Sequence, residues 1–118
     1  MAQLQQVVES LQLVLSPDPS SRHSAEQQLE QLSACPGYSC ALVQVFLDQA
    51  AYVSVRQAAV FVLKHVVKTK WDTILEQDRN FVKAHLPSAL KDGESRLRQA
   101  AANILAVVGT RFLADALP

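Results

Sequence analysis

Glycine is scarce in this sequence, with three residues among 118. A phosphate-binding loop needs several glycines close together, because the backbone must approach the nucleotide. Gly93 in "GESR" and Gly109 in "VGTR" are isolated, so the sequence predicts no such loop. No nucleophile elbow, Cys–His arrangement or pair of carboxylates with catalytic spacing is present either. We therefore expect a protein that is not an enzyme.

Cysteines and long apolar runs are also few. Cys35 and Cys40, in "ACPGYSC", are too few for a four-ligand metal site, and no histidine stands at ligand spacing. We therefore expect no metal and no other cofactor, and we interpret both cysteines as small side chains flanking a Pro-Gly turn. No apolar run reaches the length of a membrane span, and "MAQLQQVVESLQLVL" lacks the basic start of a signal peptide. The sequence predicts no membrane segment.

An excess of charge of either sign is absent. Eleven Lys and Arg balance eleven Asp and Glu, and aromatic residues make up 6% of the chain. Proteins that bind nucleic acid usually carry a basic surface and often a series of exposed aromatics, so we do not expect nucleic acid as a partner. His23, His65 and His85 are scattered, and we interpret them as surface residues.

Apolar residues, at 49% of the chain, are abundant, and Ala, Leu, Gln and Val dominate. Their spacing follows the helical period in six segments. Helices are expected at about 3–15, 19–34, 39–51, 55–71, 72–91 and 96–117. In the fifth, Val82, Leu86, Ala89 and Leu90 are aligned, and Pro87 predicts a kink near its end. The fold class is therefore all-α.

The second, fourth and sixth helices share a pattern of Arg, Ala three residues later and Leu seven residues later. The copies begin at residues 22, 56 and 98, so the offsets are 34 and 42 residues. The members are Arg22, Ala25, Leu29; Arg56, Ala59, Leu63; and Arg98, Ala101, Leu105. Such a period with two helices per unit is typical of an α-α superhelix. We expect three helical hairpins, at 3–34, 39–71 and 73–117.

The units resemble HEAT repeats, and "VRQAAVFVLKHVVKTKW" at 55–71 resembles the importin-β (karyopherin) N-terminal domain. Arg, Ala, Leu and Lys are followed there by a basic cluster and Trp, namely Arg56, Ala59, Leu63, Lys64, Lys68, Lys70 and Trp71. "AEQQLEQL" and "LRQAAANILAVVGT" also match this family, so the resemblance covers roughly residues 4–113. HEAT units often carry an acidic residue six positions before the Arg. Asp92 stands there in the third unit, but Ser16 and Ala50 stand there in the first two, so no regular Asp-to-Arg ladder is expected.

The resemblance implies that this is the N-terminal segment of a nucleocytoplasmic transport receptor, a HEAT-repeat solenoid that binds the GTPase Ran in its GTP form. It also implies shuttling between nucleus and cytoplasm, with cargo and nucleoporins bound by the longer parent chain. In the family, the second helix of each repeat lines the surface that meets Ran. The alternative is a HEAT scaffold that joins proteins without any GTPase; dependence of binding on the nucleotide would separate the two.

The helix at 55–71 carries the candidate binding residues on the side opposite its apolar arc. Gln57, Phe61, Lys64 and Lys68 follow one another at offsets of four, three and four residues, which puts them on one face. An aromatic residue flanked by lysines is typical of an interface anchor with a polar rim. The corresponding positions of the second and sixth helices are Gln27, Gln31, Gln99 and Asn103. We expect these eight residues to contact Ran.

Structural interpretations of the same residues stay open. The lysines also complement the helix dipole, and Phe61 could pack on a neighbouring repeat. We interpret Trp71 as closing a repeat core and Arg22, Arg56 and Arg98 as hydrogen-bonding between repeats. At the other end, the sixth helix is apolar on more than one side. We expect Ala100, Ile104, Val107 or Val108 and the tail "FLADAL" to form an open face, through which the isolated chain self-associates or at which it frays.

Overall fold

Six α-helices and two 3₁₀ helices make up the computed structural model, which describes the chain from residue 2 to 116 and its side chains from 4 to 109. The α-helices are α1 (Ala2–Val14), α2 (Pro19–Leu32), α3 (Tyr38–Leu47), α4 (Val53–Lys70), α5 (Glu76–His85) and α6 (Ser95–Ala116). The 3₁₀ helices are η1 (Trp71–Thr73) and η2 (Leu86–Lys91). No strand occurs between residues 2 and 116, so the predicted all-α class is confirmed.

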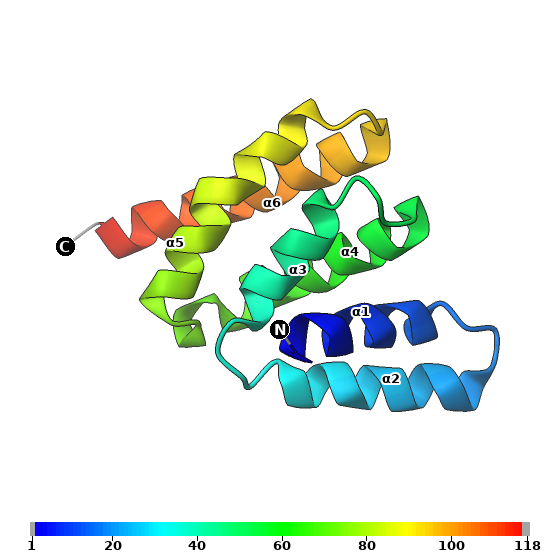
Figure 1. Ribbon diagram of the computed structural model, residues 1–118. Helices are drawn as coiled ribbons and strands as arrows, with labels where there is room; N and C mark the ends of the chain where they lie inside the picture. The colour runs from blue at the N-terminus through cyan, green and yellow to red at the C-terminus, as the bar shows by residue number, and fades with distance from the viewer. Residues whose placement is uncertain (1, 117–118) are drawn as a thin grey trace.

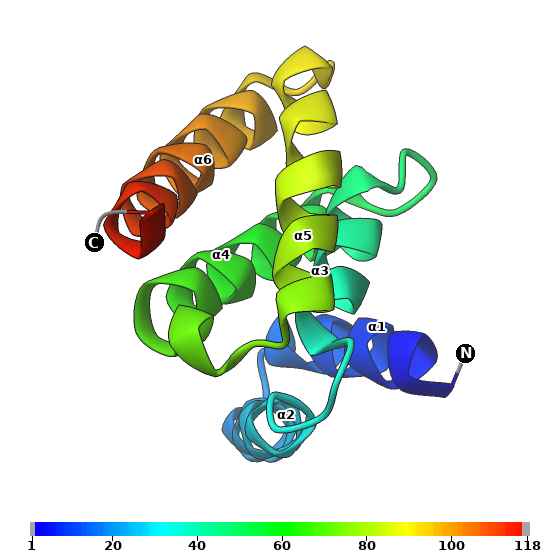
Figure 2. The same cartoon turned by 90° about the vertical axis from the view of Figure 1, so that its left-hand side faces the viewer.

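The helices form three stacked antiparallel pairs (Figure 1). The pairs are α1 with α2, α3 with α4, and α5 with its extension η2 against α6. After a quarter turn, α2, α4 and α6 are seen to follow one another along one side, while α1, α3 and α5 lie on the other (Figure 2). The second helix of every pair therefore contributes to the same side of the molecule.

Local chemistry sets the helix boundaries. Asp18 caps α2 by accepting a hydrogen bond from the Ser21 amide at 3.3 Å, and Pro19 occupies the first helical turn, where its missing N–H costs nothing. Gly37 precedes α3 with φ of 85°, a left-handed conformation that favours glycine. Pro87 falls within η2, because proline cannot continue the α-helical hydrogen bonds of α5. The kink predicted there is thus a change from α5 to a 3₁₀ helix.

The repeated alanines are buried. Ala25, Ala59 and Ala101 are all at most 1% exposed. Leu63 is fully buried, and Leu105 in the third copy is partly buried against the same core. The pattern found in the sequence therefore marks the contacts between helices, where a small side chain permits close packing and the leucine fills the adjacent space.

Three expectations about the helices are corrected. The fifth helix begins at Glu76, four residues after the predicted start at residue 72, because the chain forms the separate 3₁₀ helix η1 and turns extended at Ile74. The third helix ends at Leu47, four residues before the predicted end, because the backbone turns extended at Asp48. Leu90 is exposed, since the tighter winding of η2 turns it away from the face of Val82.

The predicted open face on α6 is also wrong at two positions. Ile104 and Val108 are buried in this chain's own core, while Ala100 and Val107 are partly buried against it. The side chains of "FLADAL" lie outside the described residues. Self-association itself stays a prediction.

Candidate functional site

One line of side chains along α4 lies outside its buried arc, and we call its members Gln57, Phe61, Lys64 and Lys68 the α4 stripe. Phe61 is 75% exposed, an unusual state for a large aromatic side chain in the middle of a helix. Lys68 is exposed, and Gln57 and Lys64 are half-buried. The structural interpretation of Phe61 as a packing residue is therefore wrong, since it does not pack into the core of the described residues.

The exposure of Phe61 follows from the arrangement of the rest of α4. Seven of its residues are buried in two adjoining lines that face the neighbouring helices: Val55, Arg56, Ala59, Val60, Leu63, Val66 and Val67. This arc faces α3, α6 and α1, which all pack against α4. Since a helix places residues three and four apart on one face, burial of that arc leaves the α4 stripe outside. Trp71 directly after α4 is 2% exposed, as expected for a residue that closes the repeat core.

The other candidate residues belong to the second helices of the first and third hairpins, α2 and α6. Gln27 and Gln31 on α2, and Gln99 and Asn103 on α6, are all exposed. Helices α2 and α6 lie on either side of α4 along one side of the molecule (Figure 2). The exposed candidates on α2 and α6 are polar, whereas those on α4 include an aromatic ring and lysines.

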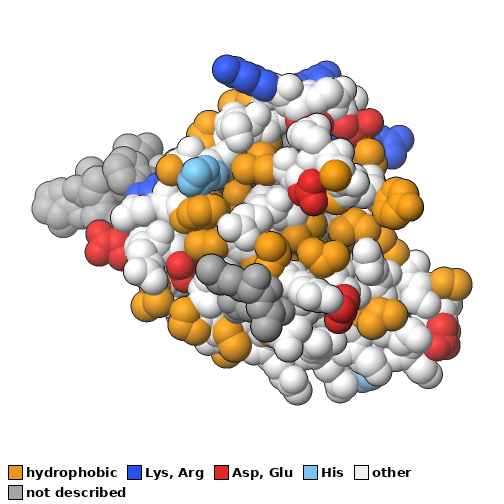
Figure 3. All heavy atoms as spheres, viewed as in Figure 1, with side chains coloured by type: hydrophobic (Ala, Val, Ile, Leu, Met, Phe, Trp, Pro, Cys, Tyr) orange, Lys and Arg blue, Asp and Glu red, His pale blue; other side chains and the backbone are white. Residues whose placement is uncertain are grey.

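The opposite face has a different character. Figure 3 shows it from the side of α1, α3 and α5: hydrophobic side chains are scattered over its middle, and Lys and Arg lie mainly along its upper edge. The combination of an exposed Phe with lysines belongs to the side of the second helices.

The three histidines are exposed, as predicted: His23, His65 and His85. The ring of His85 lies 4.2 Å from that of Phe81.

Lys70 lies next to this surface but is engaged within the chain. Its Nζ donates to Glu30 Oε1 and to Ser33 Oγ, both at 2.9 Å. The hydrogen bond and the positive charge of Lys70 lower the pKa of the Glu30 carboxyl below its ordinary value. This contact joins the last residue of α4 to the last turn of α2. The sequence pattern groups Lys70 only with the basic cluster and does not indicate this contact.

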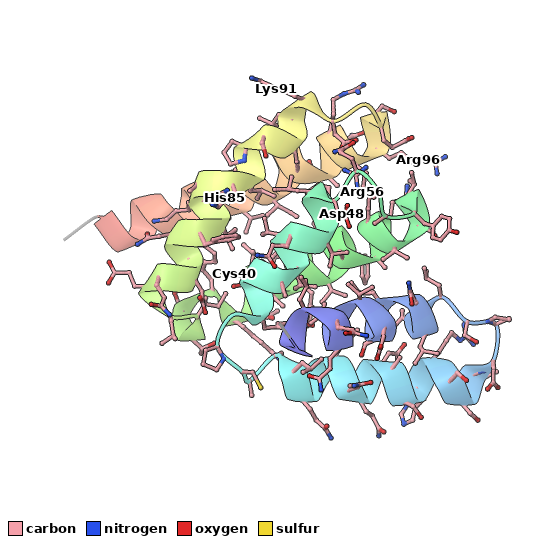
Figure 4. The ribbon with its side chains drawn as sticks, viewed as in Figure 1. Cys40, Asp48, Arg56, His85, Lys91 and Arg96 are labelled. Carbon is pink, nitrogen blue, oxygen red and sulfur yellow. The ribbon has the colours of Figure 1, made fainter. Side chains whose placement is uncertain are left out.

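A buried polar network connects the second and third hairpins. Arg56, 4% exposed, forms an ion pair with the Asp92 carboxylate and donates from Nε to the Phe46 carbonyl at 2.8 Å. Gln49 Nε2 donates to the same carboxylate at 3.1 Å. Figure 4 shows Arg56 extending from α4 toward the turn that follows α3, where Asp48 is labelled. The prediction that Arg56 bonds between repeats is confirmed.

The other two arginines behave differently. Arg98 donates to the backbone carbonyl of Asp92 at 2.7 Å, within its own hairpin. Arg22 is exposed, and among the described residues its side chain has no hydrogen-bond partner. The sequence explains the difference, because the position that would face Arg22 from the second hairpin holds Ala50 instead of an acid.

Asp78 forms a second buried junction, which the sequence did not reveal. This residue is 7% exposed in the first turn of α5, and its carboxylate accepts from the Gly37 amide at 2.9 Å and from Cys40 Sγ at 3.4 Å. Burial and the nearby charge of Asp78 raise the pKa of the Cys40 thiol to about 11. Cys40 is thus a half-buried hydrogen-bonding residue, while Cys35 is exposed. The only signal was the Pro-Gly turn, which places the Gly37 amide opposite α5.

Two negative observations apply to the described part of the chain. In that part, no three His, Cys, Asp or Glu side chains come together as they would to hold a metal ion. No helix within residues 2–116 has both the length and the apolar character needed to cross a membrane. The second helices expose an aromatic ring, ammonium groups and side-chain amides.

Stacked helical pairs with an exposed polar surface along their second helices define an α-helical repeat domain of the HEAT type. The sequence model of the family described as "Importin-beta N-terminal domain" matches residues 25–92, more than half of the chain. The chain belongs to this family.

Individual relatives agree with this assignment. Importin-9 from Drosophila melanogaster is 27% identical over 116 residues, which cover 88% of this chain. A probable importin-7 homolog from Dictyostelium discoideum is 30% identical over an alignment of 87 residues that covers 69% of this chain. Exportin-2 from Oreochromis niloticus is 25% identical over 115 residues, or 92% of this chain. The chain spans 8–12% of the length of these relatives.

Proposed function

We propose that this chain is the Ran-binding N-terminal segment of a nuclear transport receptor. The single observation that carries the proposal is Phe61, 75% exposed at the centre of α4 in a chain of the importin-beta N-terminal family. An aromatic side chain loses little conformational entropy on binding and buries a large area, so it is a favoured anchor for a partner.

The surroundings of Phe61 suit an acidic, polar partner surface. Half-buried Lys64 and exposed Lys68 lie one and two turns further along the same face, and their positive charges would steer an oppositely charged protein toward the anchor. Exposed Gln27 and Gln31 on α2 and exposed Gln99 and Asn103 on α6 offer amides that donate and accept hydrogen bonds. These are the groups expected at the rim of a protein interface.

We propose Ran in its GTP form as the partner because the γ-phosphate orders the switch segments of a GTPase. A rigid helical surface recognises an ordered segment at lower entropic cost than a mobile one. The proposal extends to the longer receptor: it would carry cargo, contact nucleoporins and shuttle between nucleus and cytoplasm. Cargo and nucleoporin contacts would lie mainly on the rest of that receptor.

Calorimetric titration of the chain with Ran, loaded either with GTP or with GDP, tests the proposal. We expect binding to Ran-GTP that is at least about tenfold tighter than to Ran-GDP, equivalent to about 1.4 kcal/mol. Equal affinity for the two forms, or no binding to either, would contradict the proposal. Such a result would favour a repeat scaffold without a GTPase partner.

A further inference from the structure

Helix α2 is the least anchored of the three second helices. It packs on α1, and its buried residues are Ala25 and Leu29. Helix α4, by contrast, packs against α1, α3 and α6, and no comparable helix packing joins α2 to α4 among the described residues. Direct packing between α2 and α4 therefore contributes little to the distance between them, which α1 sets indirectly by packing against both helices.

Lys70 bridges this gap at one end. Its ammonium group, at the last residue of α4, reaches Glu30 Oε1 and Ser33 Oγ, both at 2.9 Å. Ser33 Oγ in turn donates to the Glu30 carbonyl at 2.6 Å, which fixes the hydroxyl at the end of α2. The Lys70 side chain is 30% exposed, so the contact is partly shielded from water on the lysine side.

The bridged helix ends also carry candidate binding residues. Gln31 follows Glu30 directly on α2, and Lys68 stands two residues before Lys70 on α4. A change in the spacing of the two ends would move these side chains relative to each other. A partner that contacts both helices at once would then lose part of its fit, because displaced contacts cannot all be made together.

We propose that Lys70 is a positioning residue for the partner surface: through Glu30 and Ser33 it holds α2 at a fixed spacing from α4. This inference rests on the proposed function, since it concerns affinity for Ran-GTP. Lys70 itself does not have to touch Ran. The assignment gives Lys70 a role different from that proposed for Lys64 and Lys68, because its ammonium group joins α4 to α2.

The test measures the affinity of Ran-GTP for four variants. Three are the single variants Lys70→Gln, Lys70→Arg and Lys70→Glu. The fourth is the charge swap, which combines Lys70→Glu and Glu30→Lys in one protein. Because partly exposed ion pairs contribute little, we expect Lys70→Gln to weaken binding about threefold to fivefold. Lys70→Arg keeps the charge and should stay within about twofold of the unaltered chain, and the swap should bind more tightly than Lys70→Glu alone. Lys91→Gln, which removes an exposed lysine on η2, is the matched control and should have no effect.

A second measurement reports on the spacing without any partner. Amide hydrogen exchange in the last turn of α2, residues 28–32, should be faster in Lys70→Gln than in Lys91→Gln and should return to normal in the charge swap. The inference about Lys70 would be overturned, and the proposed function would stand, if the unaltered chain binds Ran-GTP tightly, Lys70→Gln binds it equally well, and amide exchange does not change. Failure of the unaltered chain to bind Ran-GTP would overturn the proposed function as well.

Discussion

Arg56 of the second hairpin forms an ion pair with Asp92 of the third, and both residues are almost completely buried. The carboxylate also accepts from Gln49 and from the Glu94 amide, so its oxygens are well satisfied. A buried charge is tolerated only when it is paired and hydrogen-bonded in this way. The network therefore fixes how the second and third repeats stack, and with them the relative placement of α4 and α6.

Removing one partner of this pair should destabilise the fold. Asp92→Ala leaves the Arg56 guanidinium buried without its counter-charge, and we expect a loss of about 3–5 kcal/mol in the free energy of unfolding. Urea denaturation of both proteins measures it. Asp72→Ala, at an exposed position, is the control and should stay within about 0.5 kcal/mol. A loss below about 1 kcal/mol for Asp92→Ala would show that the pair does not hold the repeats together.

The same network predicts that the free energy of unfolding depends on pH. Burial by itself raises the pKa of Asp92, but the hydrogen bonds from Glu94, Arg56 and Gln49 outweigh burial and hold it below its ordinary value of 3.8. Because the folded state binds this proton more weakly, the stabilisation is complete above pH 3.8 and is lost as the pH falls through the lowered pKa. The difference in unfolding free energy between the unaltered chain and Asp92→Asn should thus be constant at neutral pH and shrink in acid. A difference independent of pH would contradict this.

The burial of the repeated alanines predicts that a larger side chain at these positions destabilises the fold. Ala59 is fully buried, so Ala59→Leu should force neighbouring side chains apart and cost about 1–3 kcal/mol of stability. Ala102→Leu makes the same change at an exposed position of α6 and should be nearly neutral. Thermal or chemical denaturation of the two variants distinguishes them. Equal stabilities would mean that Ala59 does not mark a tight contact.

The sequence predicted these features to different extents. Ala25, Ala59 and Ala101 were recognisable because helix contacts between successive repeats demand the same small residue at the same place. The exposure of Phe61 also followed from the helical period. That Asp92 is the partner of Arg56 was harder to predict, because a pattern within one repeat does not say to which repeat the arginine will bond.

Two other contacts join residues that are far apart in the sequence and come together only in the folded chain. Glu30 and Lys70 are forty residues apart, and Asp78 reaches Gly37 across a similar separation. No local pattern encodes such contacts between loops and helix ends. The burial of Ile104 and Val108 was misjudged for a related reason: α6 packs on α4 as well as on η2, and counting apolar residues along one helix does not reveal its second neighbour.

Truncation of the exposed aromatic should act on the lifetime of the complex. Phe61→Ala removes the proposed anchor, and we expect Ran-GTP to dissociate about 5- to 30-fold faster with little change in the association rate. Surface plasmon resonance resolves the two rates. Tyr52→Ala is the matched control, since Tyr52 is 79% exposed but precedes α4 outside the α4 stripe. Identical dissociation rates for the two variants would remove Phe61 from the interface.

The most direct measurement is the association rate of Ran-GTP with the double variant Lys64→Glu, Lys68→Glu. Its control is Lys91→Glu, Arg96→Glu, which makes the same change in net charge at exposed positions on η2 and at the start of α6 (Figure 4). If the α4 stripe is the Ran-binding surface, the first variant should associate about tenfold more slowly than the control at low salt, and the difference should narrow as salt screens the charges. Association rates within twofold of each other at every salt concentration would contradict the account.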